Sequence, residues 1–194
     1  MKTQTLQTIY LKDYKPPQFL IDTVDLHIYL AEEWTTVKAE LNFRRNPASD
    51  ENNKTLILNG HKMELMAVIL DNVELKQDQY QVDESQLTIN DVPEKFVLST
   101  EVRIQPQKNT ELEGLYKSSI LFCTQCESEG FRKITYFLDR PDVMSLYSTT
   151  IYADPQLYPV MLSNGNLLDS GKLTDGRHWV KWEDPFPKPA YLFA

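Results

Sequence analysis

The segment with the sequence CTQCESEG combines two thiols, an amide and two carboxylates in a short stretch of chain. Three kinds of chemistry are compatible with it. Cys123 and Cys126 could form a redox pair or half of a zinc site, and Glu127 with Glu129 could be an acid/base pair. Alternatively, Gln125 and Glu127 could form the edge of a ligand-binding site. The element that carries the segment decides among these readings.

Alternating side chains precede the segment and predict a β-strand, with Tyr116 and Phe122 near its two ends. If the strand continues, Cys123 and Cys126 are offset by three positions and point to opposite faces. Such thiols can neither form a disulfide with each other nor bind the same metal ion. A redox pair also places its first thiolate at a helix N-terminus, which this pattern does not provide. We therefore predict that both cysteines are buried structural thiols.

A zinc site would need two further ligands, and the sequence has no second cysteine pair. The histidines His27, His61 and His178 are scattered singly along the chain. They are predicted to be surface or packing residues, so no metal ligand is assigned in this chain.

The same strand geometry favours the third reading. Residues 123, 125 and 127 share one face of a strand, so Gln125 and Glu127 would project side by side. A carboxylate beside an amide oxygen is a good receptor for an ammonium group, through charge-assisted hydrogen bonds. The alternative interpretation is that Gln125 and Glu127 are solvated surface residues without a ligand. Glu127 and Glu129 are a weaker candidate for a glycosidase pair, whose carboxylates usually come from different strands.

Period-2 alternation dominates the rest of the chain, for example over residues 24–30, 37–43 and 98–105. Asn59-Gly60, Asn164-Gly165 and Asp175-Gly176 are typical of tight hairpin turns. These signals predict an all-β fold with about a dozen strands, a β-sandwich or several packed, mostly antiparallel sheets. One short helix is expected near 130–136. No Gly/Ser linker divides the sequence, so residues 1–194 are expected to form a single β-domain.

The composition excludes several classes of partner. The formal net charge of −8 disfavours nucleic acid and anionic membranes. No apolar run approaches the ~18 residues that a membrane span requires. The first residues lack the apolar core of a signal peptide, and two cysteines are no disulfide scaffold. A cytoplasmic location is therefore expected.

The C-terminal residues suggest a longer parent protein. The proline-rich stretch 184–189 is predicted to be a stiff, extended connector. Residues 190–194 are apolar and read as the start of a buried strand that stops in mid-run. We therefore expect the sequence to be a segment of a larger chain.

The residues around the opening segment also carry a family resemblance. They closely resemble the corresponding stretches of bacterial aminopeptidase N enzymes, which belong to the gluzincin family of zinc exopeptidases. The matching stretches are residues 124–143 (TQCESEGFRKITYFLDRPDV), 158–166 (YPVMLSNGN), 176–180 (GRHWV) and 184–194 (DPFPKPAYLFA).

This resemblance implies the N-terminal β-domain of such an enzyme, a saddle-shaped assembly of twisted sheets. It implies that Glu127 binds the free α-amine of a peptide substrate and that Gln125 sits beside it, near the first substrate residue. It also implies that the zinc ligands lie on an H-E-x-x-H helix in a catalytic domain beyond Ala194. That motif is absent here. The segment alone is therefore expected to hold no catalytic residue, to bind no zinc and to be inactive.

Two other functions remain open at this stage. The chain could be a self-standing β-sandwich module that binds a carbohydrate or a protein, or an autonomous hydrolase that uses Glu127 and Glu129. An H-E-x-x-H motif encoded downstream would favour the aminopeptidase, whereas a stop codon after Ala194 would favour the binding module. Metal-independent activity of the isolated chain would favour the hydrolase.

Overall fold

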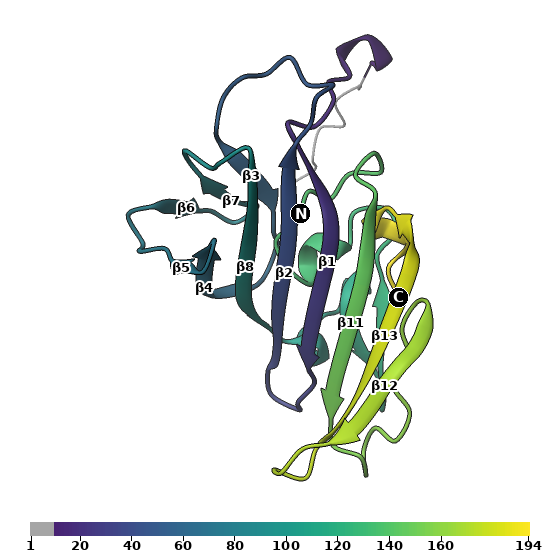
Figure 1. Ribbon diagram of the computed structural model, residues 1–194. Coiled ribbons are helices and arrows are strands. Elements are labelled where there is room, and N and C mark those ends of the chain that lie inside the picture. The colour runs from purple at the N-terminus through teal and green to yellow at the C-terminus, as the bar shows by residue number, and fades with distance from the viewer. Residues whose placement is uncertain (1–9) are drawn as a thin grey trace.

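The computed structural model describes residues 10–194, which form three β-sheets (Figure 1). The large sheet has eight strands in the spatial order β12 (Asn166–Lys172), β13 (His178–Lys188), β11 (Ser145–Ala153), β1 (Phe19–Tyr29), β2 (Thr35–Arg45), β8 (Lys95–Ile104), β4 (Glu64–Leu70) and β5 (Val73–Glu74). Its neighbouring strands are antiparallel except for β1 and β11, which run parallel. The prediction of an all-β, mostly antiparallel fold is confirmed.

Two smaller sheets complete the fold. One contains β3 (Leu56–Asn59), β7 (Gln86–Ile89) and β6 (Tyr80–Val82), which lie together at the left of Figure 1. The other is the hairpin of β9 (Gly114–Ser118) and β10 (Leu121–Gln125). The helical segments among the described residues are short 3-10 turns: η1 (Leu11–Asp13), η2 (Pro106–Lys108), η3 (Phe131–Lys133) and η4 (Ala190–Leu192). The predicted short helix after Gly130 corresponds to η3.

Alternation of apolar and polar side chains explains the long strands. In β1 and β2 the apolar positions are buried, and the register places Val24 opposite Leu41 and Leu26 opposite Ala39. The polar positions between them point to the other face of the sheet, because successive side chains in a strand alternate. One face of the large sheet therefore supplies the core.

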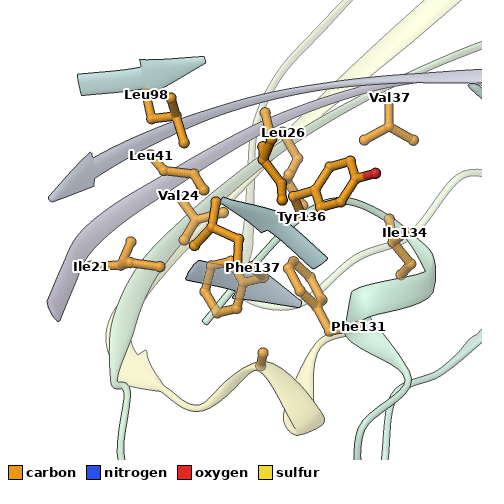
Figure 2. Packing of buried hydrophobic residues seen from close by; sticks show 14 of the residues in the cluster. Ile21, Val24, Leu26, Val37, Leu41, Leu98, Phe131, Ile134, Tyr136 and Phe137 are labelled. Carbon is orange, nitrogen blue, oxygen red and sulfur yellow. The ribbon is translucent and has the colours of Figure 1, made fainter. Parts of the chain in front are cut away.

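The segment that follows the CTQCESEG motif covers this buried face. Figure 2 shows Phe131, Tyr136 and Phe137 lying against side chains of the large sheet. Phe131 makes an edge-to-face contact with Phe137, with ring centroids 4.8 Å apart. Each such buried aromatic side chain stabilises the fold by about 1.5–3 kcal/mol. The motif is thus followed directly by residues that are fixed in the core.

Turn chemistry is only partly as predicted. Asp175-Gly176 lies in the connection between β12 and β13, and Gly176 has a φ of 90°. Asn59-Gly60, in contrast, forms no hairpin, because β3 pairs with β7 rather than with the next strand. Gly60 is required for another reason: a Cβ atom there would lie 2.2 Å from the ring of Tyr136.

The C-terminal residues differ from the predicted strand. Ala190–Leu192 form the 3-10 turn η4, and Phe193 is buried against Phe131. The backbone N–H of Ala194 donates to the side-chain oxygen of Asn164, and the carbonyl of Ala194 accepts from Asn164 N–H. The apolar residues of this segment pack as a turn. A short apolar run in a sequence does not distinguish a packed turn from a buried strand.

Candidate functional site

The β9–β10 hairpin carries the first of the two predicted site residues. Gln125 is the last residue of β10, pairs with Gly114 of β9 and is exposed. Glu127 is also exposed, but it lies two residues beyond the end of the strand. The prediction that residues 123, 125 and 127 share one strand face is therefore wrong for Glu127, which belongs to a turn.

This turn spans residues 126–130 and places the backbone of Glu127 beside the side chain of Gln125. The backbone N–H of Gly130 donates to the carbonyl of Cys126 over 2.9 Å, which reverses the chain. The side-chain amide of Gln125 faces the carbonyl oxygen of Glu127 at 3.4 Å. The peptide bond between Glu127 and Ser128 is cis. A turn, rather than strand alternation, sets the orientation of Glu127.

Close backbone packing holds the turn against the hairpin. A Cβ atom at Gly130 would lie 2.4 Å from the carbonyl oxygen of Gln125 and 2.9 Å from the backbone nitrogen of Gly114. Gly114 itself has a φ of 73° and packs against Gly130 and Lys133. Only glycine allows backbones to approach this closely. The turn that carries Glu127 is consequently fitted to the strand that carries Gln125.

The two other carboxylates near the turn are both paired with Arg132. The guanidinium lies 3.2 Å from the carboxylate of Glu129 and 3.0 Å from that of Asp139. Burial raises the pKa of Asp139, and the hydrogen bonds from Arg132 oppose this shift. Glu127 takes part in no ion pair among residues 10–194, so its carboxylate is the one in the turn that remains open to a cation.

The cysteines are free thiols in two different settings. Cys126 is buried, and this burial raises the pKa of its thiol to about 12. Such a thiol stays protonated at neutral pH and is a poor nucleophile. Cys123 is only half-buried, so the prediction of a buried structural thiol is confirmed for Cys126 and wrong for Cys123.

Each histidine has a hydrogen-bond partner of its own. His27 contacts the Tyr152 hydroxyl at 2.9 Å, His61 the carbonyl of Glu84 at 3.2 Å, and His178 the carbonyl of Tyr158 at 2.8 Å. Among residues 10–194, no three His, Cys, Asp or Glu side chains converge in a way that could hold a metal ion.

An apolar hollow begins beside Gln125 and was missed by sequence reasoning. It has a volume of about 370 Å³ and includes Cys123 and Thr124 in its wall. Leu121, Val160 and Leu162 line it and are 61%, 73% and 69% exposed, and we call these three residues the apolar rim. The only sequence signal was the run Pro159–Leu162, which is apolar without strand alternation.

None of the helices within residues 10–194 has the length and apolar character of a membrane span.

The sequence profile of the peptidase M1 N-terminal domain matches residues 12–192 of this chain. The chain belongs to the peptidase M1 N-terminal domain family. Two curated members are similar over almost all of it. Aminopeptidase N of Caulobacter vibrioides is 50% identical over 194 residues, and aminopeptidase N of Escherichia coli K12 is 46% identical over 192 residues. The chain covers 22% of the length of each of these relatives.

Solved structures agree with this membership of the peptidase M1 N-terminal domain family. Legionella pneumophila aminopeptidase A, crystallised with aspartic acid, matches 94% of this chain with a TM-score of 0.89 and 36% identity, over 22% of its own length. An M1 zinc metallopeptidase from Deinococcus radiodurans matches 92% of this chain with a TM-score of 0.76, over 42% of its own length. Its identity of 12% supports the fold alone.

Proposed function

We propose that this chain is the substrate-anchoring N-terminal domain of a zinc-dependent aminopeptidase that removes N-terminal amino acids from peptides. In this proposal Glu127 accepts hydrogen bonds from the free α-ammonium group and Gln125 lies beside it at the first substrate residue. Membership of the M1 N-terminal domain family supports the proposal, as do curated relatives that are aminopeptidases.

The observation that carries the proposal is the unequal pairing of the carboxylates at the turn. Glu129 and Asp139 both contact Arg132, whereas Glu127 is exposed and forms no ion pair among the described residues. A carboxylate without a cationic partner is available to a ligand ammonium group. One charge-assisted hydrogen bond of this kind contributes about 1.5–3 kcal/mol.

An exopeptidase has to measure distance from the amino terminus of its substrate. A carboxylate on a turn that is packed against a hairpin supplies a fixed reference point for that terminus. Binding the amine there places the first peptide bond at a constant distance from Glu127, which is how positioning contributes to rate. In the proposal the zinc ion is held by residues outside this chain.

The partner of this domain is, in the proposal, the catalytic domain of the same enzyme. Relatives that are more than four times as long support this, because the chain covers 22% of their length. The exposed apolar rim around the hollow beside Gln125 is the surface that suits such a neighbour. Docking there would bring the two site residues next to the catalytic domain. The isolated chain is accordingly inactive in this proposal, and the enzyme is cytoplasmic.

The proposal is tested by Glu127→Ala in the full-length enzyme. We expect kcat/KM for an amino-acid amide or peptide substrate to fall about tenfold or more, since each 1.4 kcal/mol of lost interaction is tenfold. The fold should be retained, because the side chain is exposed. Unchanged kinetics would exclude the anchoring role.

Glu129→Gln provides the matched control. Its carboxylate belongs to the same turn but is 66% exposed and pairs only with Arg132 at 3.2 Å, and such surface pairs contribute little. We expect its kcat/KM to change less than about twofold. Equal losses in Glu127→Ala and Glu129→Gln would instead favour a general acidic patch, or the acid/base pair considered from the sequence.

A further inference from the structure

Arg132 connects the end of the motif turn to Asp139 through three hydrogen bonds. Its backbone N–H and its Nε both donate to the Asp139 carboxylate, at 3.1 and 3.0 Å. One terminal nitrogen of the guanidinium donates to the backbone carbonyl of Asp139 at 3.1 Å. Arg132 and Asp139, seven residues apart in the sequence, are thus joined through both side chain and backbone.

The Arg132–Asp139 pair, which we call the latch, is largely buried. The side chain of Asp139 is 2% exposed and that of Arg132 is 22% exposed. A buried carboxylate without its guanidinium would be left uncompensated, so the pair has little freedom to rearrange. The backbone carbonyl of Arg132 also accepts from the N–H of His61 at 2.9 Å, which ties the latch to the loop after β3.

The latch is coupled to Glu127 through the backbone of the turn. Arg132 lies two residues after Gly130, whose N–H bonds to Cys126 and whose carbonyl accepts from Lys133 N–H at 3.0 Å. Gly130 in turn packs directly on the backbone of Gln125. A shift of Arg132 therefore moves the turn that presents Glu127, although Arg132 itself faces Asp139.

We propose that Arg132, held by Asp139, is a positioning residue that fixes the Glu127 carboxylate at the distance where it meets the substrate amine. This inference rests on the proposed anchoring role of Glu127. Lysine cannot replace arginine here, because a single ammonium group cannot reproduce the planar fork that serves the carboxylate and the carbonyl together.

A double-mutant cycle in the full-length enzyme tests the inference, using Arg132→Lys, Glu127→Ala and the combined variant. We expect Arg132→Lys to lower kcat/KM about tenfold in the wild-type background, because small misplacements of binding groups are costly. In the Glu127→Ala background the same change should cost less than about twofold, since the residue it positions is gone. A loss of similar size in both backgrounds, or no loss in the wild type, would overturn the positioning role.

Arg140→Lys is the matched control. Arg140 also forms a two-pronged pair with an aspartate, Asp142, at 2.9 and 2.7 Å. Among residues 10–194 this pair makes no hydrogen bond or ion pair with the motif turn. We expect its kcat/KM to stay unchanged. Thermal melting of every variant accompanies the kinetics, and Asp139→Asn replaces Arg132→Lys in the cycle if the lysine variant does not fold.

The two proposals fail in different ways. If Glu127→Ala alone leaves kcat/KM unchanged, the anchoring role fails and the positioning inference falls with it. If Glu127→Ala lowers kcat/KM but Arg132→Lys lowers it by the same factor in both backgrounds, the anchoring role stands. Only the positioning inference is then wrong.

Discussion

At the scale of single residues, surroundings rather than side-chain type distinguish Glu127. Three acidic side chains lie close together in sequence, but the guanidinium of Arg132 pairs with Glu129 and Asp139 and leaves Glu127 to solvent. The two cysteines of the same motif also differ in their surroundings, because Cys126 is buried and Cys123 is only half-buried. Burial raises the pKa of the Cys126 thiol to about 12, so this thiol is a poor nucleophile at neutral pH.

Gly130 makes the placement of Glu127 possible, and we predict that Gly130→Ala destabilises the protein. The added Cβ would meet two backbone atoms, at 2.4 and 2.9 Å, that cannot swing away as side chains do. Overpacking of this kind costs about 1–3 kcal/mol. For a domain of this size that lowers Tm by roughly 2–10 °C, measured by calorimetry.

The control for this prediction is Gly176→Asn. Gly130 has an ordinary φ of −80°, whereas Gly176 has a positive φ of 90°. A Cβ atom at Gly176 meets nothing within 4 Å, and asparagine tolerates such backbone angles. Its Tm should therefore fall less than that of Gly130→Ala. An equal loss in both variants would mean that close packing does not explain the glycine at position 130.

At the scale of elements, ion pairs fasten the β9–β10 hairpin to its surroundings. Lys117 of β9 pairs with Glu32 at 2.7 Å and lies over the rings of Phe122 and Tyr158. On the other side, Lys133 of η3 pairs with Glu111 and Glu113 at 2.5 and 2.6 Å. These charged contacts hold β9 and the segment before it, and β10 is held through its backbone pairing with β9.

The Glu111 pairing predicts a pH dependence of stability. Hydrogen bonds from Lys133 and Lys62 lower the pKa of Glu111 from 4.5 to about 2. A folded-state pKa below the unfolded value stabilises the fold at pH values above about 4.5, and this contribution is lost as the pH falls toward 2. The group is largely exposed, so we expect a small effect that salt weakens further.

The measurement is the Tm of the chain and of Glu111→Gln from pH 7 to pH 2. The wild type should melt at a higher temperature near neutral pH, and the difference should vanish toward pH 2. A difference that stays constant over this range would show that the Glu111 charge is not responsible.

At the scale of the whole molecule, the apolar rim has no covering partner among residues 10–194. Leu121, Val160 and Leu162 line the same hollow as Phe193 and Ala194. Exposed apolar groups that cluster around a hollow are typical of interaction sites. This surface, together with the adjacent Gln125, defines the side of the domain that we assign to the catalytic partner.

We predict that the isolated chain self-associates through this rim. Replacing Val160 and Leu162 by serine should shift sedimentation velocity profiles toward the monomer and reduce binding of a hydrophobic dye. Neither residue is buried, so the melting temperature should change little. Val73→Ser, at an equally exposed position on the short strand β5, is the control and should leave association unchanged.

The sequence by itself determined the strands, because alternation records which side chains of β1, β2 and β8 are buried. It also indicated the family and, by resemblance, predicted Gln125 and Glu127 as the site residues. Tertiary structure alone decided that β10 ends at Gln125 and that Glu127 stands on a turn, since contacts of Gly130 with Gly114 and of Arg132 with His61 hold that end. It likewise decided that the C-terminal residues form a packed 3-10 turn instead of a strand. Local patterns record burial, whereas the ends of elements and the pairing of charges depend on contacts between residues far apart in the chain.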